Sequence, residues 1–163
     1  MAPTLEQLVE RMAALQPKLR RKKLTIAAAE SCTGGLLGTV LTAHGGASDH
    51  FRGGAIVYSN DAKTILADVA PQLVASHGAV SSVVSGALAR GARTRLGAKV
   101  GLAITGIAGP GGATPGKPVG LTFVAIDSDA HSVVRKHVWP FDRTGNRLAS
   151  VGAALDLLED LVG

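Results

Sequence analysis

The sequence predicts an α/β fold, a three-layer α/β/α sandwich around a mixed, mostly parallel sheet of five strands. Short runs of small and aliphatic residues alternate with stretches of helical periodicity, the order expected of strands followed by covering helices. Near the end of the chain only residues 128–130 separate two strand-like runs, so at least one strand must be antiparallel. The 163 residues are enough for one domain, residues 1–163, with its own core and no linker or internal repeat.

The first helix is predicted to begin behind Thr4. Apolar residues recur at helical spacing from Leu5 to Leu15, and Gln7 stands three residues after Thr4, the spacing of a capping box. Pro17 is expected to kink or end this helix, because proline has no amide hydrogen and its ring collides with the preceding turn. The alanine-rich run 24–29 is typical of a short buried strand.

The other helices are predicted from their first residues, because serine and asparagine accept hydrogen bonds from the free amides there and proline suits the first helical position. They are expected to begin close after Ser31, after Asn60 (61–69), at Pro71, after Ser81 or Ser82 (81–97), and at about Arg143 (to Val162). The other strands are aliphatic runs bounded by glycine or polar residues. They are 53–59, 99–105, 119–127 and 131–139, of which the last two form the hairpin.

The net charge of +5 comes from one local cluster. Five of the 17 basic residues lie in residues 18–23, and without them 12 basic residues balance 12 acidic ones. A solvated helix end is the favoured interpretation, since basic side chains suit the carboxyl end of a helix. Binding of a polyanion is the alternative, but no aromatic residues are interleaved with the cluster, so nucleic acid is not expected as a partner.

The composition favours a cytoplasmic protein. No apolar run approaches the roughly 18 residues of a membrane span, and no basic stretch followed by an apolar one marks a signal peptide. A single cysteine, Cys32, excludes an internal disulfide. The five histidines show no metal-ligand spacing, so no metal site is predicted.

Residues 30–35, ESCTGG, place an acid and two candidate nucleophiles between a strand and a helix. Ser31 is well placed for nucleophilic attack if a base lies nearby; otherwise Ser31 or Thr33 is an ordinary N-cap. Cys32 is the rival nucleophile, because a helix amino end lowers the pKa of a thiol, or it is a small buried residue. Three roles are open for Glu30. It could orient a substrate, form an ion pair with Lys63, or compensate the dipole of the following helix.

Lys63 falls in the first turn of the helix predicted after Asn60, where its charge opposes the helix dipole. Unless this lysine is simply solvated, burial would lower its pKa and make it a general base for a serine. Tyr58 is expected at the end of the preceding strand. There it could relay a proton, hold a group of the substrate, or pack in the core with its hydroxyl in water.

Thr105 ends a strand, and a glycine-dense loop follows it over residues 106–112. Such a loop exposes amide groups that can bind a phosphate or a carboxamide. It is not a Walker A motif, because Lys117 is followed by Pro118. Since the three clusters follow three strands, we expect them to meet in one crevice at the carboxyl edge of the sheet.

Together these motifs resemble the CinA C-terminal domain family, the nicotinamide-nucleotide amidohydrolases. The motifs are AESCTGG (29–35), YSNDAK (58–63), HGAVS (77–81), TGIAGPGG (105–112) and GKPVG (116–120), and the resemblance covers about residues 5–162. It implies a sandwich with a mixed five-stranded sheet. It also implies hydrolysis of nicotinamide mononucleotide to nicotinate mononucleotide and ammonia, a step of pyridine nucleotide salvage, without a metal or organic cofactor.

The resemblance further implies roles for individual residues. Ser31 matches the nucleophile and Lys63 its base, while Tyr58 and Thr105 match further catalytic positions. Amides near 33–35 or in the 105–112 loop are expected to hold the oxyanion, and residues 33–35 or Arg143 the nucleotide phosphate. The residues expected to bind substrate are Glu30, Thr33, Gly34, Gly35, Asn60, Gly106, Gly109, Gly111 and Arg143.

Two stretches depart from the family pattern. Ala47 stands where a residue with a hydroxyl group is usual. The segment before the last helix is shorter than in the family pattern but keeps Asp142 and Arg143. Family chains often carry a molybdopterin-binding-like domain, and this sequence resembles the form without it. We expect a small-molecule nucleotide as partner, no membrane association and a homo-oligomer. The alternative is a non-catalytic module that binds nucleotides or competence- and damage-related partners.

Overall fold

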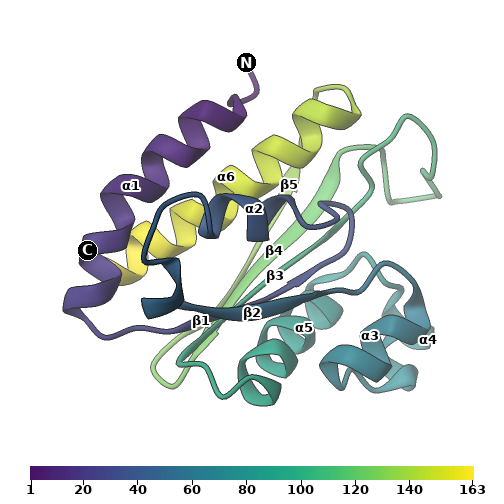
Figure 1. Ribbon diagram of the computed structural model, residues 1–163. Coiled ribbons are helices and arrows are strands. Elements are labelled where there is room, and N and C mark those ends of the chain that lie inside the picture. The colour runs from purple at the N-terminus through teal and green to yellow at the C-terminus, as the bar shows by residue number, and fades with distance from the viewer.

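Helices and strands alternate along the chain in the computed structural model, which describes all residues 1–163 (Figure 1). The strands are β1 (Ile26–Glu30), β2 (Phe51–Ile56), β3 (Val100–Gly106), β4 (Leu121–Ser128) and β5 (Ser132–Val138). The helices are α1 (Leu5–Arg21), α2 (Leu36–Leu41), α3 (Asn60–Ala67), α4 (Pro71–His77), α5 (Ser82–Arg95) and α6 (Arg143–Val162), with a short 3-10 helix η1 over Ala47–Asp49. None of the helices has the length and apolar character needed to cross a bilayer.

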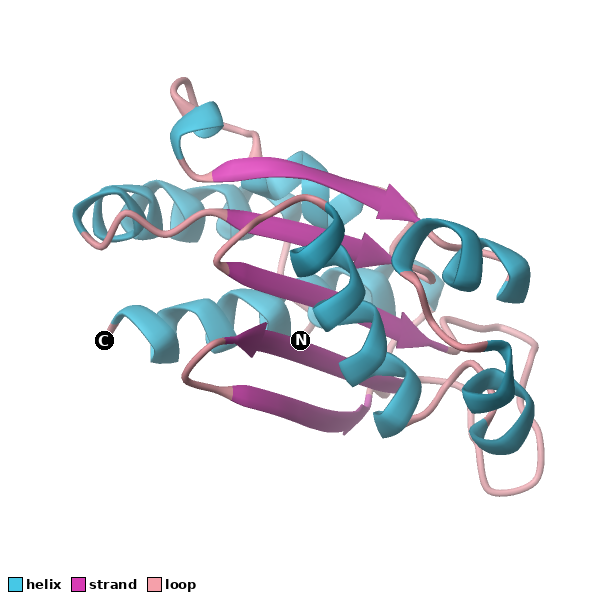
Figure 2. Cartoon of the chain, turned by 90° about the horizontal axis from the view of Figure 1, so that it is seen from below, coloured by secondary structure: helices cyan, strands magenta, loops and turns pink.

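The five strands form one mixed sheet in the order β2-β1-β3-β4-β5 (Figure 2). β1 pairs in parallel with β2 and β3, whereas β4 pairs in antiparallel fashion with β3 and β5, so β4 alone runs against the other four strands. The predicted fold class is confirmed. Because β1, β2 and β3 run in the same direction, their carboxyl ends meet at one edge of the sheet.

Two helical layers cover the sheet, with α1, α2 and α6 on one face and α3, α4 and α5 on the other (Figure 1). Both layers pack on aliphatic and alanine side chains of the strands. Glycine permits the closest approaches of α5. A Cβ on Gly91 would lie 1.7 Å from the Ala67 carbonyl oxygen, and one on Gly101 would lie 1.9 Å from that of Ala89. α5 therefore lies directly against both α3 and the sheet.

Of the two expected effects of Pro17, a kink or the end of the first helix, the second is wrong, because α1 continues to Arg21. Pro17 is exposed, and so is Ala13, whose carbonyl loses its helical donor at this proline. Water can replace the missing hydrogen bond on this side of the helix. Leu15 and Leu19 meanwhile stay buried in the core on either side of the proline.

Most helices begin at the side chains that the sequence predicted. Thr4 and Gln7 form the capping box of α1, and Ser81 is the N-cap of α5. α3 is an exception, since its N-cap is Ser59 and Asn60 is already helical. Ser59 keeps an extended backbone, and its hydroxyl accepts a hydrogen bond from the third following amide.

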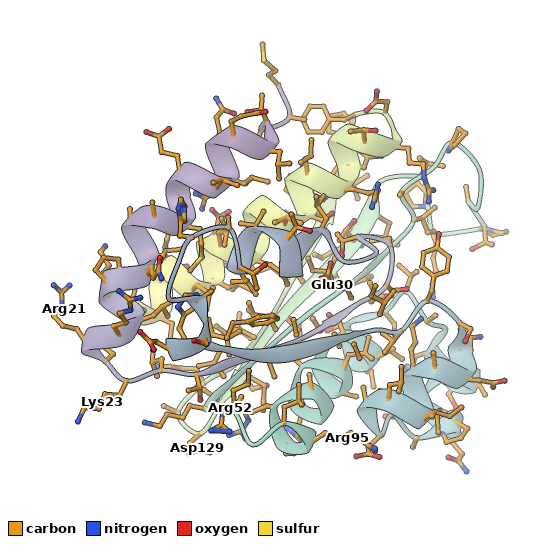
Figure 3. The ribbon with its side chains drawn as sticks, viewed as in Figure 1. Arg21, Lys23, Glu30, Arg52, Arg95 and Asp129 are labelled. Carbon is orange, nitrogen blue, oxygen red and sulfur yellow. The ribbon has the colours of Figure 1, made fainter.

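The basic cluster of residues 18–23 lies at the carboxyl end of α1, close to the amino ends of the strands. Arg20 pairs with Asp49 at 3.0 Å, while Arg21 and Lys23 point into solvent (Figure 3). This placement agrees with a solvated helix end. It puts the cluster at the edge of the sheet opposite the carboxyl ends of β1, β2 and β3.

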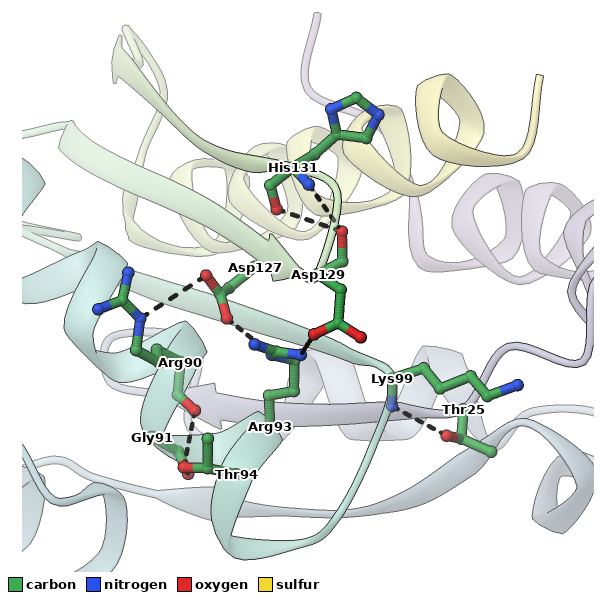
Figure 4. A network of polar contacts seen from close by, with 10 residues as sticks. Thr25, Arg90, Gly91, Arg93, Thr94, Lys99, Asp127, Asp129 and His131 are labelled. Carbon is green, nitrogen blue, oxygen red and sulfur yellow. Dashed lines mark hydrogen bonds and ion pairs between the residues drawn. The ribbon is translucent and has the colours of Figure 1, made fainter.

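An ion-pair network ties α5 to β4 and to the turn of the hairpin (Figure 4). Arg93 donates to Asp127 at 2.7 Å and to Asp129 at 2.7 Å, and Arg90 lies 3.8 Å from Asp127. The Asp127 side chain is buried, whereas that of Asp129 is almost fully exposed. A buried carboxylate requires a charge partner, so Asp127 depends on Arg93.

Candidate active site

The polar clusters that follow β1, β2 and β3 meet in one cavity of about 200 Å³ at the carboxyl edge of the sheet. The α4–α5 loop and the start of α6 complete its wall. The lining residues are Ser31, Cys32, Tyr58, Asn60, Lys63, Ala79, Val80, Thr105, Gly106, Ala108 and Arg143. The cavity is therefore the crevice that the three polar strand ends predicted.

Ser31 and Lys63 are in hydrogen-bond contact in this cavity. The Lys63 Nζ lies 3.2 Å from the Ser31 Oγ and donates to the Val57 carbonyl at 2.7 Å. Lys63 is only 1% exposed, because Lys63 and Ala67, four residues apart, form the buried face of α3. Its amino group therefore reaches the sheet edge and not the surrounding water.

No carboxylate accompanies the Lys63 ammonium. The cavity lining contains no Asp or Glu, and none of the ion pairs in the structure involves Lys63. Burial lowers the pKa of Lys63 below its ordinary value of 10.5, since the charged form loses hydration without gaining a counter-ion. A lysine with a lowered pKa can accept the proton of a serine hydroxyl.

Cys32 follows Ser31 in the chain but lies in a less reactive environment. Burial raises the pKa of the Cys32 thiol to about 11, so the thiol stays protonated at neutral pH. The three hydrogen bonds of the Lys63 amino group go to Ser31, Val57 and Ser59, and none goes to the sulfur. The geometry therefore favours Ser31 over Cys32 as the nucleophile.

Glu30 holds the turn that presents Ser31. Its carboxylate accepts hydrogen bonds from the Thr33 hydroxyl at 2.6 Å and from the amides of Gly35, Leu37 and Gly38 at 3.2, 2.9 and 2.8 Å. These amides are free donors at the start of α2, beneath which Glu30 lies (Figure 3). Of the three alternatives for Glu30, compensation of the helix end is the one that the structure shows, and no pair with Lys63 forms.

α2 begins at Leu36, later than the expected start close after Ser31. Residues 31–35 form a turn in which Gly34 and Gly35 have φ angles of +55° and +102°, a region that favours glycine. Ser31 and Thr33 are consequently not N-caps of α2. The Ser31 hydroxyl therefore caps no helix and stays available in the cavity.

Arg147, on α6, contacts this turn and was not predicted from the sequence. Its guanidinium donates from Nε to the Cys32 carbonyl at 3.1 Å and from Nη2 to the Thr33 carbonyl at 2.8 Å. No sequence signal marked it, because Arg147 lies beyond the first turn of α6, where the helix dipole no longer makes a cation unusual.

Tyr58 and Arg143 meet at the mouth of the cavity. Tyr58 is 61% exposed, so it is not a core residue, and its hydroxyl accepts a hydrogen bond from Arg143 at 3.2 Å. Arg143 also donates to the Gly109 carbonyl at 2.8 Å, which connects it to the loop after β3. The pair therefore spans the mouth from the β2 side to the α6 side.

The remaining predicted residues divide into those inside and those outside the cavity lining. Thr105, Asn60 and Gly106 line the cavity, and Thr105 donates to the Ala79 carbonyl at 2.9 Å. The predicted residues outside the lining are Glu30, Thr33, Gly34, Gly35, Gly109 and Gly111. Ala79, Val80 and Ala108 also line the cavity; they lie in the HGAVS and TGIAGPGG motifs but were not named individually as site residues.

Comparison with known proteins decides the family. The family model described as CinA C-terminal domain matches residues 8–162. The chain belongs to this family. Relatives named CinA-like protein are 47% identical over 140 residues in Acidobacterium capsulatum and 50% identical over 135 residues in Mycolicibacterium gilvum. These matches cover 86% and 82% of this chain but 34% and 32% of the relatives, so the chain spans about a third of the length of these CinA-like proteins.

Solved structures of the CinA superfamily share the whole fold. The competence/damage inducible protein CihA of Agrobacterium tumefaciens matches with a TM-score of 0.92 and 34% identity, covering 100% of this chain and 99% of that chain. A CinA superfamily protein of Escherichia coli matches with a TM-score of 0.90 and 31% identity, covering 97% of this chain and 90% of that one. The resemblance noted in the sequence motifs is therefore confirmed at the level of family and fold.

Proposed function

We propose that this CinA-family chain hydrolyses the carboxamide of nicotinamide mononucleotide to nicotinate mononucleotide and ammonia, with Ser31 as nucleophile and Lys63 as base. One observation carries the proposal. The Ser31 hydroxyl lies 3.2 Å from a buried lysine that has no acidic partner, at the carboxyl edge of the sheet. A base in hydrogen-bond contact with a hydroxyl is the arrangement that activates a serine.

The reaction follows from this contact in two stages. The Ser31 Oγ attacks the amide carbon while neutral Lys63 takes the hydroxyl proton. The tetrahedral intermediate then collapses, the C–N bond breaks, and the leaving nitrogen takes the proton back and departs as ammonia. In the second stage Lys63 accepts a proton from water, which attacks the acyl carbon and releases the carboxylate and the Ser31 hydroxyl.

The charge of the cavity suits a nucleotide. Arg143 lies at its mouth, and no acidic side chain lines it. A concave site with charge of one sign attracts a ligand of the opposite sign, here the phosphate of the mononucleotide. Arg143 would hold that phosphate, with the Tyr58 hydroxyl beside it and the pyridine ring directed toward Ser31.

A direct test measures ammonia release from nicotinamide mononucleotide. The purified chain is compared with Ser31→Ala, Lys63→Met and Cys32→Ala. We expect the wild type and Cys32→Ala to release ammonia and the other two variants to lose the activity. If Cys32→Ala is inactive and Ser31→Ala is active, the assignment of the nucleophile is wrong.

A second candidate function, a non-catalytic nucleotide-binding module, is decided by the same experiment. Wild-type chain that binds the mononucleotide but releases no ammonia across a range of pH would establish this alternative. The intact contact between Ser31 and Lys63 favours the enzyme, because a binding module has no use for a buried unpaired base. A cytoplasmic location, a homo-oligomer and a place in pyridine nucleotide salvage stay predictions.

A further inference from the structure

The contact of Arg147 with the turn after Ser31 is not used by the mechanism above. The Arg147 side chain is half-buried and crosses from α6 to the carbonyls of Cys32 and Thr33. None of the ion pairs in the structure involves it. The Arg147 guanidinium, which has no acidic partner, is thus held by two carbonyl groups of one turn.

The amides of the same turn divide into occupied and free donors. Gly34 donates to the Ser31 carbonyl at 3.1 Å, and Gly35, Leu37 and Gly38 donate to Glu30. The amides of Cys32 and Thr33 donate to no backbone carbonyl and to no side chain of another residue. Buried amides are normally paired, so two successive free donors directly after the nucleophile call for an acceptor.

Peptide geometry sets the direction of these two donors. In a planar trans peptide the N–H points opposite to the carbonyl of the same unit. The Cys32 carbonyl is bound by Arg147, so the Thr33 N–H points away from α6. The Ser31 carbonyl is bound by Gly34 inside the turn, so the Cys32 N–H points out of the turn. Ser31 and Cys32 both line the cavity, and Thr33 follows them directly behind its wall.

We propose that the amides of Cys32 and Thr33 form the oxyanion-binding site for attack by Ser31, and that Arg147 is the positioning residue that orients them. The inference rests on the proposed role of Ser31 as nucleophile. It reduces the set of amides that could bind the oxyanion, because the Gly34 and Gly35 amides already donate hydrogen bonds to Ser31 and Glu30. Arg147 acts on the peptide units and does not touch the substrate.

Arg147→Ala tests this role, with Arg147→Lys as the conservative variant and Arg11→Ala as the matched control. Arg11 also binds α6, through the Gly152 carbonyl, Asp156 and Glu159, but lies away from the turn. Loss of one oxyanion donor typically lowers kcat about 10²–10³-fold, and loss of orientation should lower it at least about tenfold. We expect this fall in kcat in Arg147→Ala with KM changed less than about threefold, since the ground state makes little use of the donors.

The other two variants separate positioning from stability. Arg147→Lys restores one of the two contacts and should recover part of kcat. Arg11→Ala should lower the melting temperature and leave kcat unchanged. If folded Arg147→Ala keeps the wild-type kcat, or if only KM rises, the inference is overturned. Should Arg147→Ala fail to fold, Arg147→Lys decides alone, and a kcat equal to wild type overturns it.

A serine-directed fluorophosphonate provides a readout that does not depend on the natural substrate. The Ser31 Oγ forms a bond to phosphorus, fluoride leaves, and the hydroxyl proton passes to Lys63, while negative charge develops on the phosphoryl oxygen. The rate of labelling, followed by intact mass with Ser31→Ala as blank, should fall at least about tenfold in Arg147→Ala. Labelling of wild type without hydrolysis of the mononucleotide would reject the proposed substrate and still test Arg147. Wild type that does neither overturns both proposals.

Discussion

The Lys63 amino group lies 3.2 Å from the Ser31 hydroxyl, although 32 residues separate the two in the chain. Ser31 follows β1, and Lys63 lies on α3 after β2, the parallel neighbour of β1. The pair exists because two adjacent parallel strands deliver their following segments to the same edge of the sheet. Its chemistry depends on burial, which lowers the pKa of the lysine.

The pH dependence of the reaction should report Lys63. Burial lowers the pKa of Lys63 below 10.5, and only the neutral amine can accept the serine proton. We therefore expect kcat/KM to rise with pH and to reach a plateau above the lowered pKa of Lys63, which lies below 10.5. Lys63→Arg, which stays charged, should lower kcat at least about 10³-fold at every pH. A wild-type profile that falls with increasing pH over this range would contradict the assignment.

Cys32→Ala should keep at least half of the wild-type activity. Burial raises the pKa of the Cys32 thiol to about 11, so very little thiolate is present at neutral pH. For the same reason, iodoacetamide at pH 7.5 should alkylate folded wild type far more slowly than the urea-unfolded chain. Rapid alkylation of the folded chain with parallel loss of activity would instead identify a reactive cysteine.

Glu30→Gln should destabilise the chain by about 2 kcal/mol, because the carboxylate that accepts four hydrogen bonds becomes an amide with one acceptor oxygen. Urea unfolding measures the change. Glu10→Gln on the exposed face of α1 is the control and should leave stability unchanged. Equal stability of Glu30→Gln and wild type would show that the turn does not depend on this charge.

Asp127 and Asp129 offer a matched pair on opposite sides of one arginine. Both lie 2.7 Å from Arg93, but the Asp127 side chain is 4% exposed and that of Asp129 is 98% exposed. Asp127→Asn should cost about 3 kcal/mol, since it leaves a partly buried guanidinium without its buried partner, whereas Asp129→Asn should unfold at the wild-type urea midpoint. Similar effects of the two substitutions would contradict this account of the network.

His50 should make the fold sensitive to mild acid. His50 is buried, its Nδ1 has no hydrogen-bond partner, and burial lowers its pKa below 6.5. The unfolded chain therefore binds the proton more readily, so stability is full above about pH 6.5 and is lost as the pH falls through the lowered pKa. Urea unfolding at pH 5 to 7.5 should show this loss in wild type and a smaller one in His50→Gln.

The exposed His131 provides the control for this pH dependence. His131→Gln should follow the wild-type stability curve over the same pH range, because its side chain lies in water in the hairpin turn. If His50→Gln loses stability with falling pH as steeply as wild type does, another group is responsible for the acid sensitivity.

Local chemistry alone determined much of this protein. The capping box of Thr4 and Gln7, the hairpin across residues 128–130 and the start of α6 at Arg143 depend on neighbours within a few residues, so the sequence was enough to predict them. The meeting of the strand ends followed from the same reasoning, because parallel strands share one carboxyl edge. The specific pairing of Ser31 with Lys63, by contrast, was implied by the resemblance to the family and not by this rule.

Tertiary packing decided the rest. Pro17 stays inside α1 because the leucines around it are buried and its own side faces water. α2 starts at Leu36 because the Glu30 carboxylate folds back to accept its amides, and Arg147 contacts the turn only because α6 packs beside α2. Each of these outcomes depends on where a distant surface or charge lies in three dimensions, and local preferences of a fraction of a kcal/mol yield to such contacts.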